Sequence, residues 1–169
     1  MIKETISKLL NEQVNAEYYS AYLYLSMAAY ADRAGYKGIA NWLHVQAKEE
    51  MAHGTRIFQY MLERGALPSL GGIKAPPASY SGITEIFEKV LAHEQGVTES
   101  INRIATLAEQ EKDHAAYQFI SWYVSEQVEE EASAEELLTR VKLIDSHSGL
   151  LFNLDTALAS RVFTDPFGR

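Results

Sequence analysis

The sequence predicts an all-α protein: a four-helix bundle with one long crossover connection and a short fifth C-terminal helix. Four long stretches carry apolar residues at intervals of three and four positions, the spacing of one helix face. Glycine and proline lie mainly between these stretches. Of the three connections between them, one is long and two are short. A chain of 169 residues fits a single domain, residues 1–169, with the bundle at about 5–143 and the last helix at about 150–161.

The first two helices are expected at residues 5–34 and 38–64, and each stops at a glycine. Gly35 and Gly65 follow their last residues, and glycine is common after a helix because it adopts positive φ at little cost. The turn between these two helices is short, so they must be antiparallel neighbours.

A segment rich in glycine and proline, residues 66–82, follows the second helix. At about 3.3 Å per residue it could extend to about 55 Å, which exceeds the ~45 Å length of one such helix. It can therefore run the whole length of the bundle. The third helix is expected at 83–111, and the fourth runs to about Leu143 with Asp113 as its N-cap.

Each long helix has an apolar stripe that polar side chains interrupt near its middle. The stripes are, in chain order, Leu10, Val14, Glu17, Ala21, Tyr24, Ala28 and Ala31; Leu43, Ala47, Glu50, His53, Ile57 and Met61; Ile83, Phe87, Val90, Glu94, Val97, Ile101, Ile104 and Ala108; and Ala116, Ile120, Tyr123, Gln127, Glu130, Ala134, Leu137 and Val141. No lysine or arginine occurs on them. A buried carboxylate is costly unless it is protonated, paired or metal-bound, so a bound cation would resolve the conflict.

A single glutamate on an apolar stripe usually lies at the rim of a core, and Glu50-x-x-His53 alone is a common pattern. The indication of a metal site comes from four helices that are interrupted at the same depth. Carboxylate oxygens with an imidazole suit iron, manganese or zinc better than copper. Glu50 and His53 are one helical turn apart and can chelate one ion together.

Composition excludes several classes of protein. Without cysteine the chain has no disulfides and no Cys-ligated zinc or iron–sulfur site. A net charge of -8 disfavours nucleic acid and anionic lipid and attracts cations, although it equally serves solubility. No run reaches the ~18 uncharged apolar residues of a membrane span, and residues 1–5 lack the apolar run of a secretion signal. We therefore expect a cytoplasmic protein with no nucleic-acid or membrane partner.

Several runs resemble the non-haem ferritins of prokaryotes, within the ferritin-like di-iron superfamily. They are Glu17, Tyr24, the run EEMAH at 49–53, His93-Glu94, and the run SEQVEE at 125–130. The resemblance covers the whole chain, including the crossover and the fifth helix. It implies iron storage: a ferroxidase that oxidises Fe(II) with dioxygen or peroxide at a di-iron centre and deposits Fe(III) mineral inside a homo-24-mer cage.

The resemblance also implies roles for individual residues at that centre. The first iron would be held by Glu17, Glu50 and His53. The second would be held by Glu94 and Glu130, with Glu50 as the bridge between the two ions.

Further roles follow from the same resemblance. Gln127 would bind weakly or lie just outside the ligands, and Tyr24 would be a hydrogen-bond donor or redox partner. A probable third iron site would consist of Glu49, Glu126 and Glu129, with Glu130 shared between sites.

One departure from the superfamily pattern stands on the fourth helix. The usual second Glu-x-x-His is here Gln127-x-x-Glu130, which separates the chain from bacterioferritins and rubrerythrins. Met51 occupies the place of the haem-binding methionine of bacterioferritins, but non-haem ferritins carry methionine there too, so no haem is expected. Trp122 is expected near the centre, either as its neighbour or as an ordinary core aromatic.

Three functional classes compete. They are a storage ferritin, a non-storing di-iron oxidase or peroxidase, and a structural bundle whose polar core residues set helix register without metal. The fifth helix favours storage, because Asn153, Leu154, Ala157 and Leu158 form a stripe that a lone bundle would not need. In ferritins this helix lines the four-fold axis, whereas DNA-protecting mini-ferritins lack it. Large aromatic residues outside the stripes are expected at interfaces between subunits: Tyr30, Tyr36, Tyr80 and Phe152.

Overall fold

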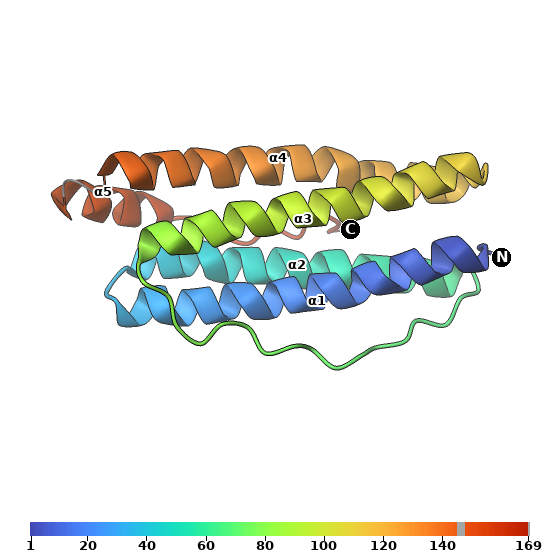
Figure 1. Ribbon diagram of the computed structural model, residues 1–169, viewed down its shortest axis with the longest axis horizontal. Coiled ribbons are helices and arrows are strands. Elements are labelled where there is room, and N and C mark those ends of the chain that lie inside the picture. The colour runs from blue at the N-terminus through green and yellow to red at the C-terminus, as the bar shows by residue number, and fades with distance from the viewer. Residues whose placement is uncertain (145–147, 169) are drawn as a thin grey trace.

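A computed structural model describes residues 1–144 and 148–168, and it confirms the all-α bundle (Figure 1). The helices are α1 (Glu4–Arg33), α2 (Lys37–Glu63), α3 (Ile83–Gln110), α4 (His114–Ile144) and α5 (Ser148–Leu158). The four long helices begin and end within a residue or two of the expected positions. The fifth begins and ends a few residues earlier than expected, so the chain after Leu158 forms a non-helical tail.

The crossover runs along α1 for the length of the bundle and joins α2 to the far end of α3 (Figure 1). Side chains of α1 hold its backbone in place. Asn11 Oδ1 accepts the Ser69 N–H at 2.6 Å, and Asn15 Oδ1 accepts the Gly71 N–H at 2.7 Å. These bonds satisfy exposed backbone groups of a segment that has no helix or sheet of its own.

The helix ends carry the expected caps. Gly35 and Gly65 have φ of 93° and 77°, the left-handed region that glycine enters without steric cost. Asp113 Oδ1 accepts the Ala116 N–H at 3.0 Å, which caps the first turn of α4 as predicted. The same carboxylate pairs with Arg64 at 2.9 Å and so ties the ends of α2 and α4 together.

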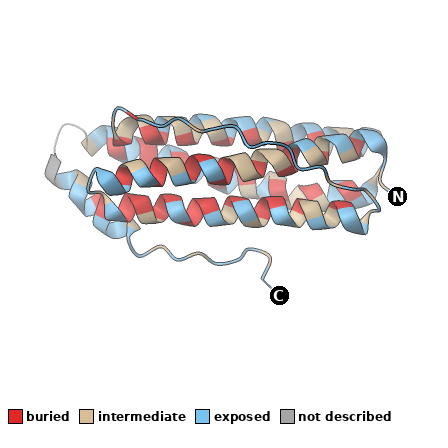
Figure 2. Ribbon diagram, turned by 90° about the horizontal axis from the view of Figure 1, so that it is seen from below, coloured by how far each residue is buried: buried red, intermediate tan, exposed pale blue. Residues whose placement is uncertain are grey.

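The core consists of two apolar clusters, one toward each end of the bundle, with polar side chains between them. Every residue of the four expected stripes is buried. Figure 2 shows the buried positions along the inward faces of the long helices. The stripe periodicity therefore identified the core, including the level at which it stops being apolar.

The expectation that Tyr80 faces a neighbouring subunit is wrong. Its side chain is 8% exposed, because the end of the crossover folds onto α1 and places the ring in the core cluster. Tyr30 packs against it with ring centroids 5.6 Å apart, and Tyr36 is half-buried against the same cluster. Phe152 is 69% exposed, so of these four aromatics it is the one fully available to a partner.

The fifth helix docks against the start of α2. Asp155 Oδ1 accepts the Ile39 N–H at 2.8 Å, which satisfies one of the unpaired donors of the first turn of α2. Leu154 is buried in the core cluster. Among the described residues, none of the helices combines the length and apolarity needed to cross a bilayer.

Candidate metal centre

Polar side chains from all four long helices meet between the two apolar clusters. Each is at most 8% exposed: Glu17 of α1, Glu50 and His53 of α2, Glu94 of α3, and Gln127 and Glu130 of α4. The stripes predicted this convergence because residues at equal depth on antiparallel helices face one another. In the part of the chain that the structure describes, the fully buried polar residues include no lysine or arginine.

The tightest group of potential ligands is Glu17, Glu50 and His53. One ligand atom from each lies within 4.8 Å of the other two, and Glu50 Oε2 is 3.7 Å from His53 Nδ1. Glu17 Oε2 and His53 Nε2 are buried and have no hydrogen-bond partner among the described residues. Unpartnered buried oxygen and nitrogen atoms are costly, and a cation would satisfy both. The site therefore fits a metal ion on its own geometry.

Glu94 and Glu130 lie outside that tight group and are oriented by neutral donors. Tyr24 donates its phenol hydrogen to Glu94 Oε1, and Gln127 Nε2 donates to Glu94 Oε2 at 3.2 Å. Gln46 Nε2 donates to Glu130 Oε2 at 2.8 Å. Hydrogen bonds of this kind hold a carboxylate in one orientation without neutralising it, as outer partners do around metal ligands.

Burial governs the protonation of these carboxyl groups. It raises the pKa of Glu17 and Glu50 well above the ordinary range, and neighbouring carboxylates raise both further. Burial and the nearby Glu94 raise the pKa of Glu130 to about 7. The pKa of the Tyr24 phenol is also raised, first by burial and then by Glu94, so it remains a hydrogen donor. Without metal, the centre keeps protons that a cation would displace.

The residues of the expected third site lie at the edge of this centre. Glu49 and Glu126 are half-buried and Glu129 is exposed. Glu49 Oε2 accepts a hydrogen bond from Arg161 Nη2 at 2.7 Å. Burial raises the pKa of Glu49, and Arg161 opposes that rise. Within the described ranges, these three glutamates do not join the close cluster of Glu17, Glu50 and His53.

Aromatic rings pack against the outer side of His53. The Trp122 ring lies edge-on at 5.5 Å between centroids, which confirms its expected place beside the centre. Tyr123 donates its phenol hydrogen to the His53 carbonyl oxygen at 2.9 Å. These contacts fix the imidazole against α4.

Comparison with known proteins agrees with this geometry. A family model for ferritin, described as a ferritin-like domain, matches residues 7–144. The chain belongs to the ferritin family. It is 38% identical to a bacterial non-heme ferritin of Staphylococcus aureus strain MRSA252, over 98% of this chain and 99% of the relative. It is also 38% identical to a probable bacterial non-heme ferritin-like protein of Haemophilus influenzae, over 95% of this chain and 97% of the relative.

Solved ferritin structures superpose closely on this ferritin chain. An open-pore ferritin from the archaeon Archaeoglobus fulgidus has a TM-score of 0.94 at 44% identity, with coverage of 96% of this chain and 100% of that one. A structure described as a humanized archaeal ferritin has a TM-score of 0.95 at 46% identity, with coverage of 97% and 99%.

Sequence reasoning missed three buried polar residues of this ferritin bundle: Gln13, Ser20 and Gln46. Gln13 Nε2 donates to Glu17 Oε1 at 2.8 Å, and Gln46 supports Glu130. Gln13 and Gln46 each precede a stripe glutamate by four residues, so both lie one helical turn from it on the same face. That spacing was a usable signal. Ser20 bonds to His93 at 2.7 Å, a pairing between α1 and α3 that neither stripe indicates.

Proposed function

We propose that this chain is an iron-storage ferritin, which oxidises Fe(II) at a buried two-iron centre and deposits the Fe(III) product inside a closed cage of 24 copies. The observation that carries the proposal is the group of Glu17, Glu50 and His53. It brings anionic and imidazole ligands together in an interior with unpartnered ligand atoms and without a basic side chain. Iron is here the substrate of the chain.

Each ligand has its own role in the proposal. Glu17, Glu50 and His53 take the first Fe(II), and Glu94 and Glu130 take the second. Glu50 bridges, because its carboxylate faces His53 and its pKa responds to Glu94 across the site. A shared bridge holds two metals about 3.5–4 Å apart, the usual spacing of two-metal sites.

The protein contributes charge and geometry to the oxidation. Dioxygen takes one electron from each Fe(II), and carboxylates favour the harder Fe(III) product. The protons held on Glu17, Glu50 and Glu130 leave as the ions bind. Tyr24 keeps its phenol hydrogen on Glu94 and so holds that carboxylate in place.

The neutral Gln127 distinguishes this centre from one that retains its metal. At its position a carboxylate would add a charge to the site, and an amide does not. With one histidine and one amide, the ligand set binds Fe(III) less completely, which allows the product to move on. Glu49, Glu126 and Glu129 form the proposed third site on that route, with Glu130 shared between sites.

Storage requires a container, and α5 supports one. Leu150 is 48% exposed and Phe152 is 69% exposed on a short helix with an apolar face. Exposed apolar side chains grouped on one element favour burial against another copy. We place α5 at the four-fold axis of the cage.

Anaerobic loading followed by oxygen tests the centre. The purified assembly should bind Fe(II) without oxygen and then oxidise two Fe(II) per chain in a fast phase, followed by slower turnover. Light scattering tests the container, because a cage of 19.0 kDa chains has a mass of several hundred kilodaltons. A monomer or dimer that still oxidises iron would instead support the non-storing di-iron oxidase.

A further inference from the structure

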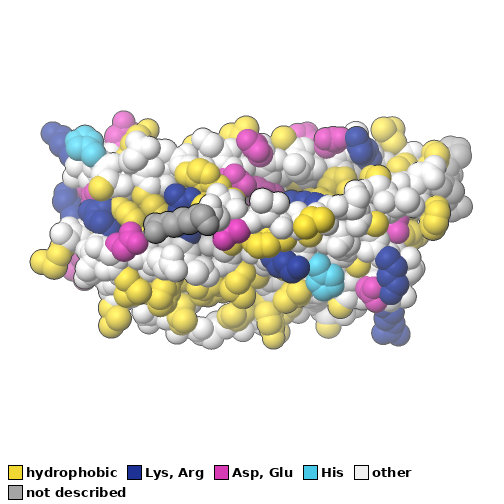
Figure 3. Space-filling model, turned by 180° about the vertical axis from the view of Figure 1, so that it is seen from behind, with side chains coloured by type: hydrophobic (Ala, Val, Ile, Leu, Met, Phe, Trp, Pro, Cys, Tyr) yellow, Lys and Arg dark blue, Asp and Glu magenta, His cyan; other side chains and the backbone are white. Residues whose placement is uncertain are grey.

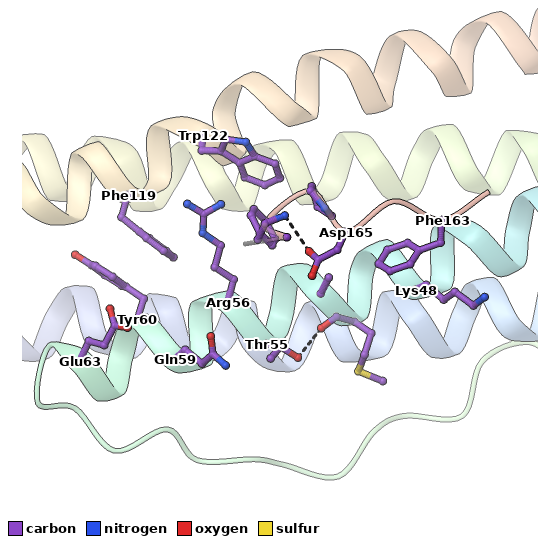
Figure 4. A pocket seen from close by; sticks show the side chains of 15 residues that line it. Lys48, Thr55, Arg56, Gln59, Tyr60, Glu63, Phe119, Trp122, Phe163 and Asp165 are labelled. Atoms are coloured by element: carbon purple, nitrogen blue, oxygen red, sulfur yellow. Dashed lines mark hydrogen bonds between the residues drawn. The ribbon is translucent and has the colours of Figure 1, made fainter. Parts of the chain in front are cut away.

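The C-terminal tail, residues 159–168, turns back from α5 and runs along the bundle toward the metal centre (Figure 1). It lies against α2 and α4, away from the crossover that follows α1 (Figure 2). On the face seen in Figure 3, acidic, basic and hydrophobic side chains are interspersed. The tail and the two helices together line a cavity (Figure 4).

Arg161 anchors the near end of the tail. Its Nη2 donates to Glu49 Oε2 at 2.7 Å, and its guanidinium carbon lies 5.0 Å from the Trp42 ring centroid. Asn41 Nδ2 fixes the backbone at this point, since it donates to the Arg161 carbonyl oxygen at 2.9 Å. Arg161 Nη1 is buried with no partner in the described part of the chain, so the tail holds this guanidinium at some cost in hydration.

Phe167 anchors the far end. Its ring centroid lies 4.4 Å from that of Trp122 and 5.9 Å from that of His53. The Arg56 guanidinium carbon lies 4.0 Å from the same ring, and Figure 4 shows Arg56 reaching from α2 toward α4. The tail thus contacts the metal centre at two points, one on Glu49 and one beside His53.

The backbone of the tail bonds mainly to itself. The Gly168 N–H bonds to the Asp165 carbonyl at 3.1 Å, and the Phe167 N–H to Asp165 Oδ1 at 2.9 Å. Side chains therefore supply most of its attachment to the bundle. A segment held in this way can leave while the helices stay folded.

We propose that Arg161 and a metal ion compete for Glu49, so that the tail covers the third metal site when that site is empty and leaves when it fills. The inference rests on the third site of the proposed function. A metal that ligates Glu49 Oε2 must displace the guanidinium, because one oxygen cannot serve both and the two cations repel each other. Arg161 is thus the counter-ion of Glu49 in the metal-free chain and a positioning residue for iron entering that site.

Linkage makes the effect reciprocal: if the tail weakens metal binding, metal binding must weaken the tail by the same factor. Both directions can be measured on the assembled protein with Zn(II), which does not change oxidation state. Calorimetry gives the affinity of the third ion, and hydrogen exchange of residues 162–168 reports on the tail.

Arg161→Ala should tighten binding of the third Zn(II) by about tenfold, the scale of one hydrogen bond to a charged group. Arg161→Lys should lie between that variant and the parent, since it keeps the charge and loses the fork. Arg140→Ala is the matched control, because Arg140 forms an exposed pair with Glu136 at 2.6 Å, far from Glu49 in sequence and outside the site. In the parent protein, a third equivalent of Zn(II) should speed exchange of the tail several-fold.

Glu129→Ala separates failure of this inference from failure of the third site itself. If Glu129→Ala removes the third ion while Arg161→Ala leaves its affinity unchanged, the site exists and the competition is overturned. If neither the parent nor Arg161→Ala binds a third ion, both the third site and the competition are overturned. A third ion that binds in the Arg161→Ala variant and weakly or not at all in the parent supports the inference.

Discussion

Tyr24 of α1 donates its phenol hydrogen to Glu94 of α3, across the middle of the bundle and with no basic side chain among the fully buried polar residues described. The bond leaves Glu94 without a neutralising partner and fixes where its carboxylate points. In the metal-free protein it contributes to the attachment of α3 to α1. With metal bound, the same bond positions a ligand.

Tyr24→Phe tests this bond. We expect the metal-free protein to lose about 1–2 kcal/mol of stability, because a buried carboxylate oxygen loses its donor. The thermal midpoint should fall by a few degrees, and excess Zn(II) should recover much of the difference because the ion then stabilises Glu94. Tyr22→Phe is the control, since Tyr22 is 51% exposed. Equal losses in the two variants would show that the bond to Glu94 contributes little.

Ligand substitution separates the centre from the third site. Glu50→Ala removes the proposed bridge and should slow the fast oxidation by about a hundredfold, the upper end of the effect of losing an outer partner. Glu129→Ala should leave the first oxidation event and change the amount of iron bound or the later turnover. Stopped-flow absorbance measures both, with Glu99→Ala as an exposed control on α3. Mild and equal effects from Glu50→Ala and Glu129→Ala would contradict the assigned roles.

Glu130 gives the metal-free protein a dependence on pH. Its pKa is about 7 in the folded chain and ordinarily 4.5, so the folded state holds this proton over that window and the unfolded state does not. Stability from this group is therefore complete below about pH 4.5 and is lost as pH rises to about 7, by about 3 kcal/mol per chain in the limit. Thermal midpoints of metal-free protein between pH 5 and 8 should fall with pH.

Glu130→Gln isolates that dependence. Its amide oxygen can still accept the bond from Gln46, and it carries no titrating proton. The variant should lose less stability than the parent as pH rises across the window. Parallel curves for the two proteins would mean that Glu130 is already ionised in the folded state.

Periodicity predicted the helices and the core because burial is a local property of a helix face. Glu17, Glu50, Glu94 and Glu130 could be identified as exceptions on their own stripes, without knowledge of the packing. Pairings between helices could not be read in that way. The bond from Gln46 to Glu130 joins residues 84 positions apart, and only the packing of α2 against α4 brings them together.

The crossover and the tail were the less predictable parts. Tyr80 belongs to a segment without periodicity, so nothing in its neighbours shows that its ring enters the core. Arg161 was assigned to the end of the fifth helix, yet the helix ends at Leu158 and the side chain instead reaches Glu49. Non-helical segments find their partners through tertiary contacts, which a local pattern does not encode.

The docking of α5 provides a test of assembly that spares the metal centre. A Cβ added to Gly38 would lie 1.6 Å from the Asp155 carbonyl oxygen, a backbone atom that cannot rotate away. Gly38→Ala should therefore displace α5 from α2 and break the bond from Ile39 to Asp155. The bundle itself has no other contact to lose there, so α1 to α4 should fold and the centre should still oxidise Fe(II).

Gly96→Ala is the matched control, because a Cβ at Gly96 would meet nothing within 4 Å and alanine favours a helix by about 1 kcal/mol over glycine. If α5 closes the cage at the four-fold axis, light scattering of Gly38→Ala should give a smaller or broader mass, while Gly96→Ala keeps that of the parent. Iron retained per chain should fall with the mass, although the rate of the first oxidation does not. A Gly38→Ala protein of unchanged mass and iron content would show that storage does not depend on where α5 docks.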